Sequence, residues 1–255
     1  MISPITQYYH LEQLFWQAIS QESQVISSDA FCYASRVPGC AFNFLFLHKN
    51  ATSDELKAGI AFFQARNLSH LIALHEKALP SLSTELACHS LEDDGMTTAM
   101  ALNMITAPRE PILPLGTLVK CVNNNLACWS QPLLTAFAHE EEPNPALVAA
   151  YQDSHSKALE KGIKLQHFVL QVDERCLCSV TLSISGESAR IDDLGTDRYY
   201  QRRGFASLLL YHVLHYAYQQ GVRQCYLEAS SDGLQLYHRL GFTPLFNYHA
   251  FVKEN

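Results

Sequence analysis

Signals of several common protein classes are missing from this chain of 255 residues. It has no apolar run of about 18 residues, the length that crosses a membrane. Its start, MISPITQYYHLEQ, lacks the charged and apolar regions of a signal peptide. Its 18 lysine and arginine residues are outnumbered by 25 acidic ones, which gives a formal net charge of -7 and does not indicate a nucleic-acid surface. We expect a cytoplasmic protein without a membrane or nucleic-acid partner.

Motifs for metals and dinucleotides are missing as well. The eight cysteines lack zinc-finger spacing, and no G-x-G-x-x-G follows an early strand, which argues against a doubly wound nucleotide-binding enzyme. Cys176 and Cys178 should project from the same face of a predicted strand. A metal or redox pair there is less favoured than reduced, buried thiols, which is our interpretation of all eight cysteines. His212 and His215 lie one helical turn apart without a third ligand, so we assign them to packing or to the surface and expect no metal.

What the chain does contain is a large apolar fraction. Hydrophobic residues make up 48% of the sequence and charged residues 17%, which is enough for a substantial buried core. The length lies at the upper edge of one domain and suffices for two domains of about 120 residues each. We therefore expect a soluble, globular protein.

The most informative stretch is DRYYQRRGFAS, residues 197–207. It separates a strand-like apolar run from a long amphipathic helix. Gln201, Gly204 and Ala206 form the pattern Q-x-x-G-x-A, a glycine turn whose backbone N–H groups converge at a helix N-terminus. Such a turn favours a phosphate, because free amides and the helix dipole both present positive charge there. An ordinary capping loop is the alternative that the turn alone leaves open.

The segments after this turn follow in a definite order. Apolar residues spaced three and four apart predict a helix over 203–220, which stops at Gly221. A strand over 222–229 follows, then a turn, the short helix LQLYHRL and Gly241-Phe242. The order is therefore strand, phosphate turn, helix, strand, short helix and strand.

This order and its motifs resemble the acetyl-CoA-binding half of the GCN5-related N-acetyltransferases, the GNAT superfamily. The family pattern is R/Q-x-x-G-x-G/A with a later Y-x-x-x-G-F, and here QRRGFA is followed downstream by LYHRLGF. The resemblance covers about 117–251. Ala206 stands at the third small position, which the family allows. Arg198 stands where many members have proline, which concerns the rigidity of the loop.

The resemblance implies that acetyl-CoA is the co-substrate and that its acetyl group passes directly to an amine in a ternary complex. The pantetheine arm would pair with the strand before the turn, and the pyrophosphate would lie on the amides of the turn, helped by its arginines. Tyr237, in LYHRLGF, would protonate the departing thiolate; a core aromatic residue is the alternative. The implied cofactor-binding residues are Leu194, Thr196, Gln201, Arg202, Arg203, Gly204, Phe205, Ala206 and Ser207.

The sequence leaves the general base open. Asp192 and Asp193 stand in the strand before the turn and should point to opposite faces, so at most one faces the acceptor. Glu228 ends the next strand and would face a cleft where the two strands splay. Asp193 and Glu228 are equal candidates for the catalytic base, and a water chain is the third. Acidic groups at the edge of this cleft would favour a cationic amine as the acceptor.

The first half of the chain shows the same order of elements, which indicates a second copy of the fold. Its helix entrance, HKNATSD, has neither glycine nor arginine, so it offers a pyrophosphate no close backbone approach. Ser53 or Asp54 would cap this helix. We interpret this half as a degenerate, silent copy with a structural or acceptor-shaping role. The segments 41–47, 54–65 and 68–74 correspond to 189–196, 203–220 and 222–229.

Three prolines in PREPILPLG, residues 108–116, indicate a stiff linker between the halves. We predict a degenerate GNAT-like domain over 1–110, a linker over 111–116 and an acetyl-CoA-binding catalytic domain over 117–255. The predicted fold is α/β (α+β), with two similar domains, each a mixed, mostly antiparallel sheet flanked by helices. Other predicted elements are helices at 8–20, 83–89, 125–138 and 145–161, strands at 30–34, 96–105, 117–122, 167–173 and 176–185, and a turn at 93–95.

We therefore predict an acetyl-CoA-dependent N-acetyltransferase that acts on a small-molecule or peptide amine. The alternative is a non-catalytic acyl-CoA-binding or protein-interaction module that keeps the fold, but such a module has no need of both the intact turn and Tyr237. The acceptor, the acyl-chain preference and the choice between monomer and homodimer are left open by the sequence.

Overall fold

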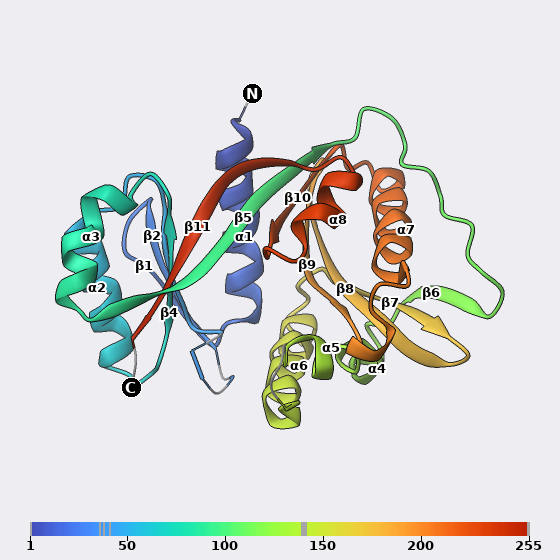
Figure 1. The fold of residues 1–255 in the computed structure, drawn as a ribbon, viewed down its shortest axis with the longest axis horizontal. Helices are drawn as coiled ribbons and strands as arrows, with labels where there is room; N and C mark the ends of the chain where they lie inside the picture. The colour runs from blue at the N-terminus through green and yellow to red at the C-terminus, as the bar shows by residue number, and fades with distance from the viewer. Residues whose placement is uncertain (1, 36, 38, 41, 139–141, 254–255) are drawn as a thin grey trace.

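The structure, a computed structural model, describes residues 2–35, 37, 39–40, 42–138 and 142–253. Both halves of the chain contain helices and strands (Figure 1). The first half contains α1 (Pro4–Ile19), β1 (Glu22–Val25), β2 (Ala30–Ala34), β3 (Phe44–Leu47), α2 (Ser53–Gln64), β4 (Leu71–His75), α3 (Leu79–Cys88) and β5 (Leu91–Asn103).

The second half of the chain contains more elements than the first, including the long helix that follows the predicted phosphate turn. A short 3₁₀ helix, η1, lies within that turn. The elements are β6 (Thr117–Cys121), α4 (Leu126–Ser130), α5 (Leu133–Ala136), α6 (Pro145–Glu160), β7 (Leu165–Val172), β8 (Arg175–Ser185), β9 (Ser188–Thr196), η1 (Arg198–Tyr200), α7 (Phe205–Gln219), β10 (Gln224–Ala229), α8 (Leu234–Arg239) and β11 (Thr243–Lys253).

The strands of the described residues join in one 11-stranded sheet, in the order β1-β2-β3-β4-β11-β5-β10-β9-β8-β7-β6. Most neighbouring strands are antiparallel. Among the described strands, the parallel pairs are β3 with β4 and β9 with β10. A helix connects the strands of each pair, α2 in the first half and α7 in the second. The predicted mixed, mostly antiparallel sheet flanked by helices is confirmed.

The two halves exchange their last strands at the centre of this sheet. β5, the last strand of the first half, pairs with β10 of the second half. β11, the last strand of the second half, pairs with β4 of the first. β5 and β11 also pair with each other and cross the middle of the molecule side by side (Figure 1). One sheet therefore spans both halves, and the domain limits 1–110, 111–116 and 117–255 stay a prediction.

Helix α7 lies on the second half of the sheet with the apolar face that its sequence predicts. It begins at Phe205 rather than at residue 203, because Gly204 has a φ of +83° and forms the N-cap. The left-handed backbone at Gly204 turns the chain sharply into the helix. The buried residues of α7 are Leu209, Leu210, Val213, Leu214 and Ala217.

Helix α1 covers the junction between the halves. Its Tyr8 and Leu11 are buried in one cluster with Tyr226 of β10. Phe15 of the same helix is buried in a second cluster with Tyr151 of α6. A helix at the start of the chain therefore packs against elements of the second half.

Proline and strand pairing explain two departures from the predicted elements. The helix predicted at 125–138 is divided into α4 and α5 at Pro132, because proline has no N–H to continue a helix. The strand predicted at 96–105 begins at Leu91 and runs through the turn predicted at 93–95. β11 pairs with Met96 and with Asp93, and the residues between them form a bulge with Gly95 at a φ of +104°, so the strand continues past the local turn signal.

Some element boundaries also differ from the prediction. The N-cap of α2 is Thr52 rather than Ser53 or Asp54, because the Thr52 hydroxyl accepts the N–H of Glu55. Helix α3 begins earlier than predicted, with a proline in its first turn. The sequence does not predict β1, whose residues are all exposed. Ala41, where a predicted strand begins, lies outside the described residues.

The cysteines are only partly as predicted. Cys128 of α4 and Cys176 of β8 form a disulfide, so the interpretation of all eight cysteines as reduced is wrong for this pair. Cys176 and Cys178 pack in different clusters, because a bulge between β7 and β8 changes the alternation of side chains. Cys88 and Cys121 are exposed, against the expected core positions.

The proline-rich segment after β5 contacts α7. His215 of α7 donates from Nδ1 to the carbonyl oxygen of Pro108 at 2.9 Å.

The described residues include no group of three or more potential metal ligands. Within the described part of the chain, no helix is long and apolar enough to cross a membrane.

Candidate active site

A bulge in β9 opens the sheet beside α7. An extra residue of β9 lies between Asp192 and Gly195, opposite β8. Asp193 lies in this bulge with a φ of +56°, a left-handed conformation that is uncommon for residues other than glycine. The parallel pairing of β9 with β10 runs only as far as Ile191. Beyond that residue, the edge of β9 up to Thr196 borders two cavities.

The predicted phosphate turn stands at the start of α7. Gly204 and Arg202 both have a left-handed backbone, with φ values of +83° and +60°. Among the described residues, no side chain caps this helix, and its first turn holds no acidic residue. A Cβ atom on Gly204 would meet nothing within 4 Å, so the space before it is open. The N-terminal amides of α7 are therefore accessible to an anion.

A cavity of about 760 Å³ lies along this turn and the end of β9; we call it the cofactor cavity. Arg203 is the predicted cofactor residue that does not line it. Its guanidinium donates to the carbonyl oxygen of Tyr199 at 3.2 Å and lies over the ring of Tyr200. The predicted residues that do line it are Leu194, Thr196, Gln201, Arg202, Gly204, Phe205, Ala206 and Ser207.

The sequence did not indicate the wall of the cofactor cavity that faces the glycine turn. It comes from α8 and from the turn before it, which bring a second cation, Arg239, to the cavity. The motif LYHRLGF contains this arginine, but its pattern draws attention to the tyrosine and the glycine. The additional residues on this wall are Ser230, Asp232, Gly233, Gln235, Leu236 and Arg239.

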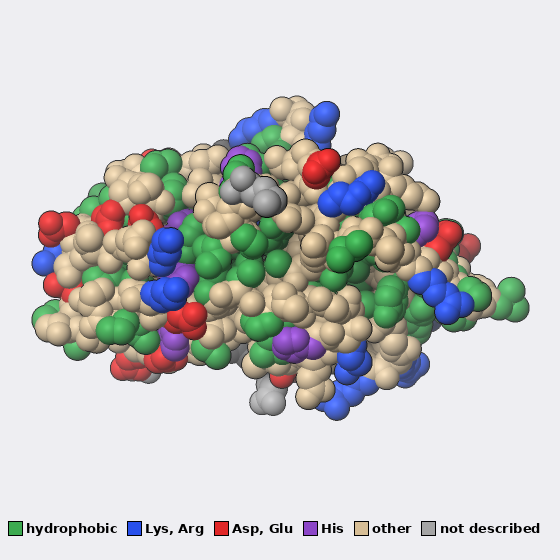
Figure 2. Space-filling model, turned by 90° about the horizontal axis from the view of Figure 1, so that it is seen from above, with side chains coloured by type: hydrophobic (Ala, Val, Ile, Leu, Met, Phe, Trp, Pro, Cys, Tyr) green, Lys and Arg blue, Asp and Glu red, His purple; other side chains and the backbone are tan. Residues whose placement is uncertain are grey.

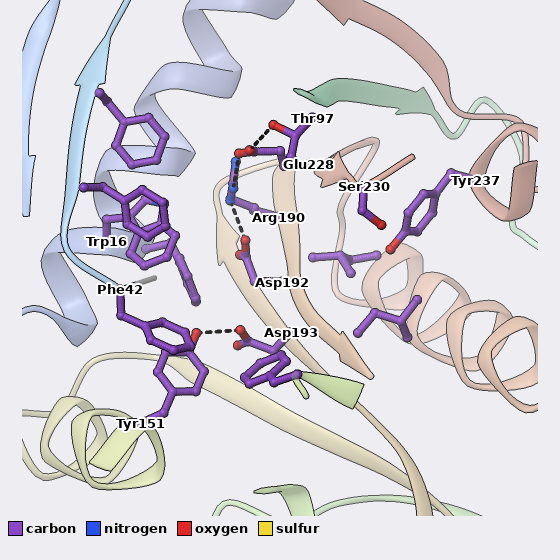
Figure 3. Close-up of a pocket in the computed structure, with 16 residues that line it drawn as sticks. Trp16, Phe42, Thr97, Tyr151, Arg190, Asp192, Asp193, Glu228, Ser230 and Tyr237 are labelled. Atoms are coloured by element: carbon purple, nitrogen blue, oxygen red, sulfur yellow. Dashed lines mark hydrogen bonds and ion pairs between the residues drawn. The ribbon is translucent and has the colours of Figure 1, made fainter. Parts of the chain in front are cut away.

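A second cavity, of about 330 Å³, adjoins the first; we call it the acceptor cavity. All three predicted catalytic residues, Asp193, Glu228 and Tyr237, line it (Figure 3). Leu194 and Ser230 line both cavities, so the two meet at this point. The fold therefore brings together the acidic and phenolic groups that the sequence singled out.

Both aspartates of β9 line the acceptor cavity, so the prediction that they point to opposite faces is wrong. The bulge adds a residue to the strand and breaks its alternation. Asp192 Oδ1 accepts a hydrogen bond from Nε of Arg190 at 2.8 Å. Burial raises the pKa of Asp192 to about 7, although Arg190 opposes the rise. Asp193 Oδ1 accepts from the Tyr151 hydroxyl at 2.6 Å, and burial raises the pKa of Asp193 to about 6.

Glu228 is held by residues of the first half. Its carboxylate accepts hydrogen bonds from the hydroxyls of Thr97 at 2.6 Å and of Tyr8 at 3.0 Å. Nη2 of Arg190 lies 3.7 Å away. Burial raises the pKa of Glu228, whereas Arg190 and the two hydroxyls oppose the rise. In contrast, Asp193 Oδ2 has no hydrogen-bond partner among the described residues, which leaves it open to accept a proton.

Tyr237 is a buried phenol at the edge of the acceptor cavity. Its ring lies against Phe242, with 5.9 Å between the ring centroids. The ring also lies only 3.0 Å from where a Cβ on Gly233 would stand, so a larger residue there would displace it. Burial raises the pKa of Tyr237 above its ordinary value. The hydroxyl is therefore protonated at neutral pH and can act as a proton donor.

The other side of the acceptor cavity is aromatic, and the first half supplies most of it. Phe15 and Trp16 come from α1, Phe44 and Phe46 from β3, and Phe42 from the segment before β3. Figure 3 shows Trp16 and Phe42 across the cavity from the aspartates. The sequence AFNFLFL signals bulky residues here, but a buried strand has the same appearance, so this wall was not predicted.

The corresponding helix start in the first half, that of α2, is capped by its own side chains. The Thr52 N–H donates to the Glu55 carboxylate at 2.7 Å, and the Glu55 N–H donates to the Thr52 hydroxyl. Asp54 and Glu55 add negative charge to the first turn of α2. Figure 2 shows acidic side chains gathered at the end of the molecule that α2 and α3 form. A phosphate would meet paired amides and like charge at this position.

Comparisons with known proteins concern the family and the fold of this chain. Residues 130–242 match the model of the acetyltransferase (GNAT) family. Among solved structures, a GCN5-related N-acetyltransferase from Kribbella flavida is similar over 97% of this chain and 96% of its own, with 15% identity and a TM-score of 0.67. A GCN5-related N-acetyltransferase from Sphaerobacter thermophilus is similar over 89% of this chain and 76% of its own, with 16% identity and a TM-score of 0.63.

A third solved structure has a duplicated architecture. It is described as a tandem GNAT protein from the clavulanic acid biosynthesis pathway, and it is similar over 91% of this chain and 83% of its own. Its sequence identity is 12% and its TM-score 0.61, so the likeness concerns the fold. Curated protein sequences show no match. Together, the family match and the shared fold confirm the resemblance that the turn and LYHRLGF indicate.

Proposed function

We propose that this member of the GNAT superfamily transfers an acetyl group from acetyl-CoA to an amine, by direct attack within a ternary complex. The observation that carries this proposal is that two cavities meet at Leu194 and Ser230. One leads to an uncapped helix start that suits a phosphate, and the other is lined by carboxylates and a phenol. Acyl transfer between two bound substrates needs both kinds of site, joined where the acyl group passes.

The cofactor cavity suits acetyl-CoA. Its pyrophosphate would lie on the amides of residues 202–206, with charge from Arg202 and from Arg239 on the facing wall. Gln201 supports this turn, because its side-chain amide donates to the Thr196 carbonyl oxygen at 3.3 Å. The edge of β9 near Leu194 is the expected partner of the pantetheine arm, because the pairing with β10 ends before it. Bound acetyl-CoA would supply an activated thioester carbonyl.

We favour Asp193 as the group that accepts the proton of the amine. Its Oδ2 is buried without a hydrogen-bond partner among the described residues, and a pKa of about 6 leaves it mostly ionised at neutral pH. Glu228 ranks below Asp193 as the base. Two hydroxyls and Arg190 already stabilise its ionised form, which makes this carboxylate a weaker proton acceptor. Tyr237 would donate its proton to the departing thiolate, since burial keeps it a phenol.

We also propose that the first half is a degenerate copy that does not bind acetyl-CoA. Its β3-α2-β4 unit has the same parallel pairing as β9-α7-β10. The start of α2, however, is capped by its own Thr52 and Glu55. The role of this half would be to complete the acceptor cavity through α1 and β3.

Calorimetry of acetyl-CoA binding tests the cofactor site with a matched pair of variants. Gly204→Glu puts a carboxylate at the phosphate turn. Gly221→Glu makes the same change at the other end of α7, at a glycine with φ +92° and equally open space. Native protein and Gly221→Glu should bind one equivalent, and Gly204→Glu should not bind. Two equivalents would contradict the silent first half, and no binding by native protein would exclude the proposed site.

Release of the CoA thiol in the presence of amines tests the reaction itself. Amine-dependent release is expected from a transferase. Binding of acetyl-CoA without any amine-dependent release would favour the alternative, a non-catalytic acyl-CoA-binding or protein-interaction module.

A further inference from the structure

The aromatic side of the acceptor cavity is built from two sets of contacting rings. The ring centroids of Trp16 and Phe44 lie 4.4 Å apart, and those of Phe44 and Phe46 lie 5.2 Å apart in a stacked arrangement. The centroids of Phe42 and Tyr151 also lie 4.4 Å apart. Rings at these distances are in contact, so together they offer a flat or ring-shaped ligand a surface to pack against.

The opposite side of the cavity is acidic and has unused polar atoms. Three carboxylates, those of Asp192, Asp193 and Glu228, face one guanidinium, that of Arg190. Buried atoms on this side without a hydrogen-bond partner among the described residues include Oδ2 of Asp192. A bound ammonium group would donate to this free carboxylate oxygen.

We propose that the amine acceptor is a small arylalkylamine, with its ring on the aromatic side and its nitrogen at Asp192 and Asp193. The inference rests on the proposed function, which places the amine in this cavity. The volume of about 330 Å³ is at the low end for small-molecule sites, which suits one ring on a short chain. An aromatic ring would cover these rings with more apolar area than a polyamine or a sugar of the same size.

Calorimetric binding of 2-phenylethylamine, butylamine and spermidine tests this inference without requiring turnover. Native protein should bind 2-phenylethylamine about tenfold or more tightly than butylamine, the discrimination expected of an apolar pocket. Phe44→Leu should remove most of this preference, whereas Tyr211→Leu, at an exposed aromatic of α7, should keep it. Equal binding of the two amines, or tighter binding of spermidine, would overturn the inference. Preferential binding without acetylation would instead contradict the proposed function.

An independent observation concerns a chain of buried polar side chains behind Asp193. Nε2 of His155, on α6, lies 3.7 Å from Oδ2 of Asp193. Nδ1 of His155 lies 2.8 Å from Nε2 of His167, on β7. Nδ1 of His167 in turn lies 2.9 Å from Oδ1 of Asn123. Both histidines are fully buried, so this chain connects Asp193 to the backbone without solvent.

The hydrogen bonds of Asn123 determine where the protons of this chain lie. Its Nδ2 donates to the Leu165 carbonyl oxygen at 2.7 Å, and its Oδ1 accepts the backbone N–H of His167 at 2.8 Å, so the orientation of the amide is set. Oδ1 therefore also accepts from Nδ1 of His167, which leaves Nε2 of His167 to accept from Nδ1 of His155.

Both histidines are neutral in this arrangement, because burial lowers the pKa of His155 and of His167. Nε2 of His155 consequently presents a lone pair to Asp193 Oδ2. Two acceptor atoms then face each other across 3.7 Å while Asp193 is ionised. A proton on Oδ2 replaces this repulsion with attraction.

We propose that His155 is a positioning residue that accepts a hydrogen bond from Oδ2–H of Asp193 once Asp193 has taken the proton of the amine. In this step the amine N–H bond breaks and the Oδ2–H bond forms, and the proton stays on Oδ2. The other groups around Asp193 are Tyr151 on α6, the Thr181 hydroxyl on β8, Asp192 and Arg190 on β9, and Glu228 on β10.

Two NMR measurements test this role without using activity. The ring nitrogens of His155 and His167 should show neutral Nδ1–H tautomers from about pH 5 to 8; an Nε2–H tautomer at either residue would overturn the proposal. In His155→Phe, the Asp193 carboxyl should bind its proton about tenfold more weakly. His212→Phe, on α7, should leave that titration unchanged. An unchanged titration in His155→Phe would limit His155 to packing.

Discussion

Removing the Tyr151 hydroxyl would test whether Asp193 or Glu228 accepts the proton of the amine in the proposed reaction. This hydroxyl donates to Asp193 at 2.6 Å and opposes the rise that burial causes in the pKa of that carboxyl. Tyr151→Phe keeps the ring that packs against Phe42 and Trp129 and deletes only the donor. The ionised form of Asp193 loses a stabilising contact, so the pKa of Asp193 should rise.

The size of the effect follows from the strength of the lost bond. A hydrogen bond to a charged group contributes about 1.5–3 kcal/mol, which corresponds to about one to two pKa units. From a native value of about 6, Asp193 would then titrate at about 7–8. At pH 7 its ionised fraction would fall from about 0.9 to between about 0.5 and 0.1. We therefore expect kcat/KM at pH 7 to fall by about two- to tenfold and to recover at higher pH.

The assay is the pH profile of kcat/KM, measured by release of the CoA thiol. Thr97→Val is the matched control, because it removes a donor that lies 2.6 Å from Glu228. If Asp193 is the base, Tyr151→Phe moves the acid limb to higher pH and Thr97→Val does not. The reverse result would refute this assignment and make Glu228 the base, and two unmoved profiles would exclude both carboxylates.

Three further predictions concern the acid, the buried histidines and the first half. Tyr237→Phe should lower kcat by about a hundredfold or more and leave the calorimetric affinity for acetyl-CoA unchanged; an unchanged kcat would make Tyr237 a core aromatic. The pKa of buried His167 is about 3, so the unfolded chain takes up a proton that the folded protein does not. In urea unfolding, native protein should therefore lose about 2 kcal/mol relative to His167→Gln between about pH 6.5 and 5, and a constant difference would contradict this. Thr52→Ala should lower the free energy of unfolding by about 1 kcal/mol without changing acetyl-CoA binding; a loss of binding would argue against a silent first half.

The elements around the glycine turn at Gly204 were predictable because short-range physics determines them. Gly204 is the residue type that adopts a φ of +83°, and the apolar stripe of α7 repeats with the period of a helix. Both signals are contained within a few residues. The turn and the helix therefore agree with their predictions, although the helix begins at Phe205 rather than at residue 203.

Long-range pairing explains the boundaries that were wrong. Local sequence predicts a turn at 93–95, but β11 pairs on both sides of it, at Met96 and at Asp93, so the turn becomes a bulge within β5. Likewise, the spacing of Cys176 and Cys178 predicts one face, and a bulge against β7 separates them. A bulge depends on the partner strand, which lies far away in the sequence, so no local pattern reports it.

The candidate site divides in the same way. The sequence alone indicated the glycine turn, Tyr237 and the acidic residues beside the strands as candidates, since their chemistry and spacing are local. Only the tertiary structure decided that Asp192 and Asp193 share one cavity, because the bulge in β9 cancels the alternation of the strand. It also decided that α1 and β3 supply the aromatic wall and that His155 lies behind Asp193. These contacts join segments far apart in the chain, and they form only when both halves build a single sheet.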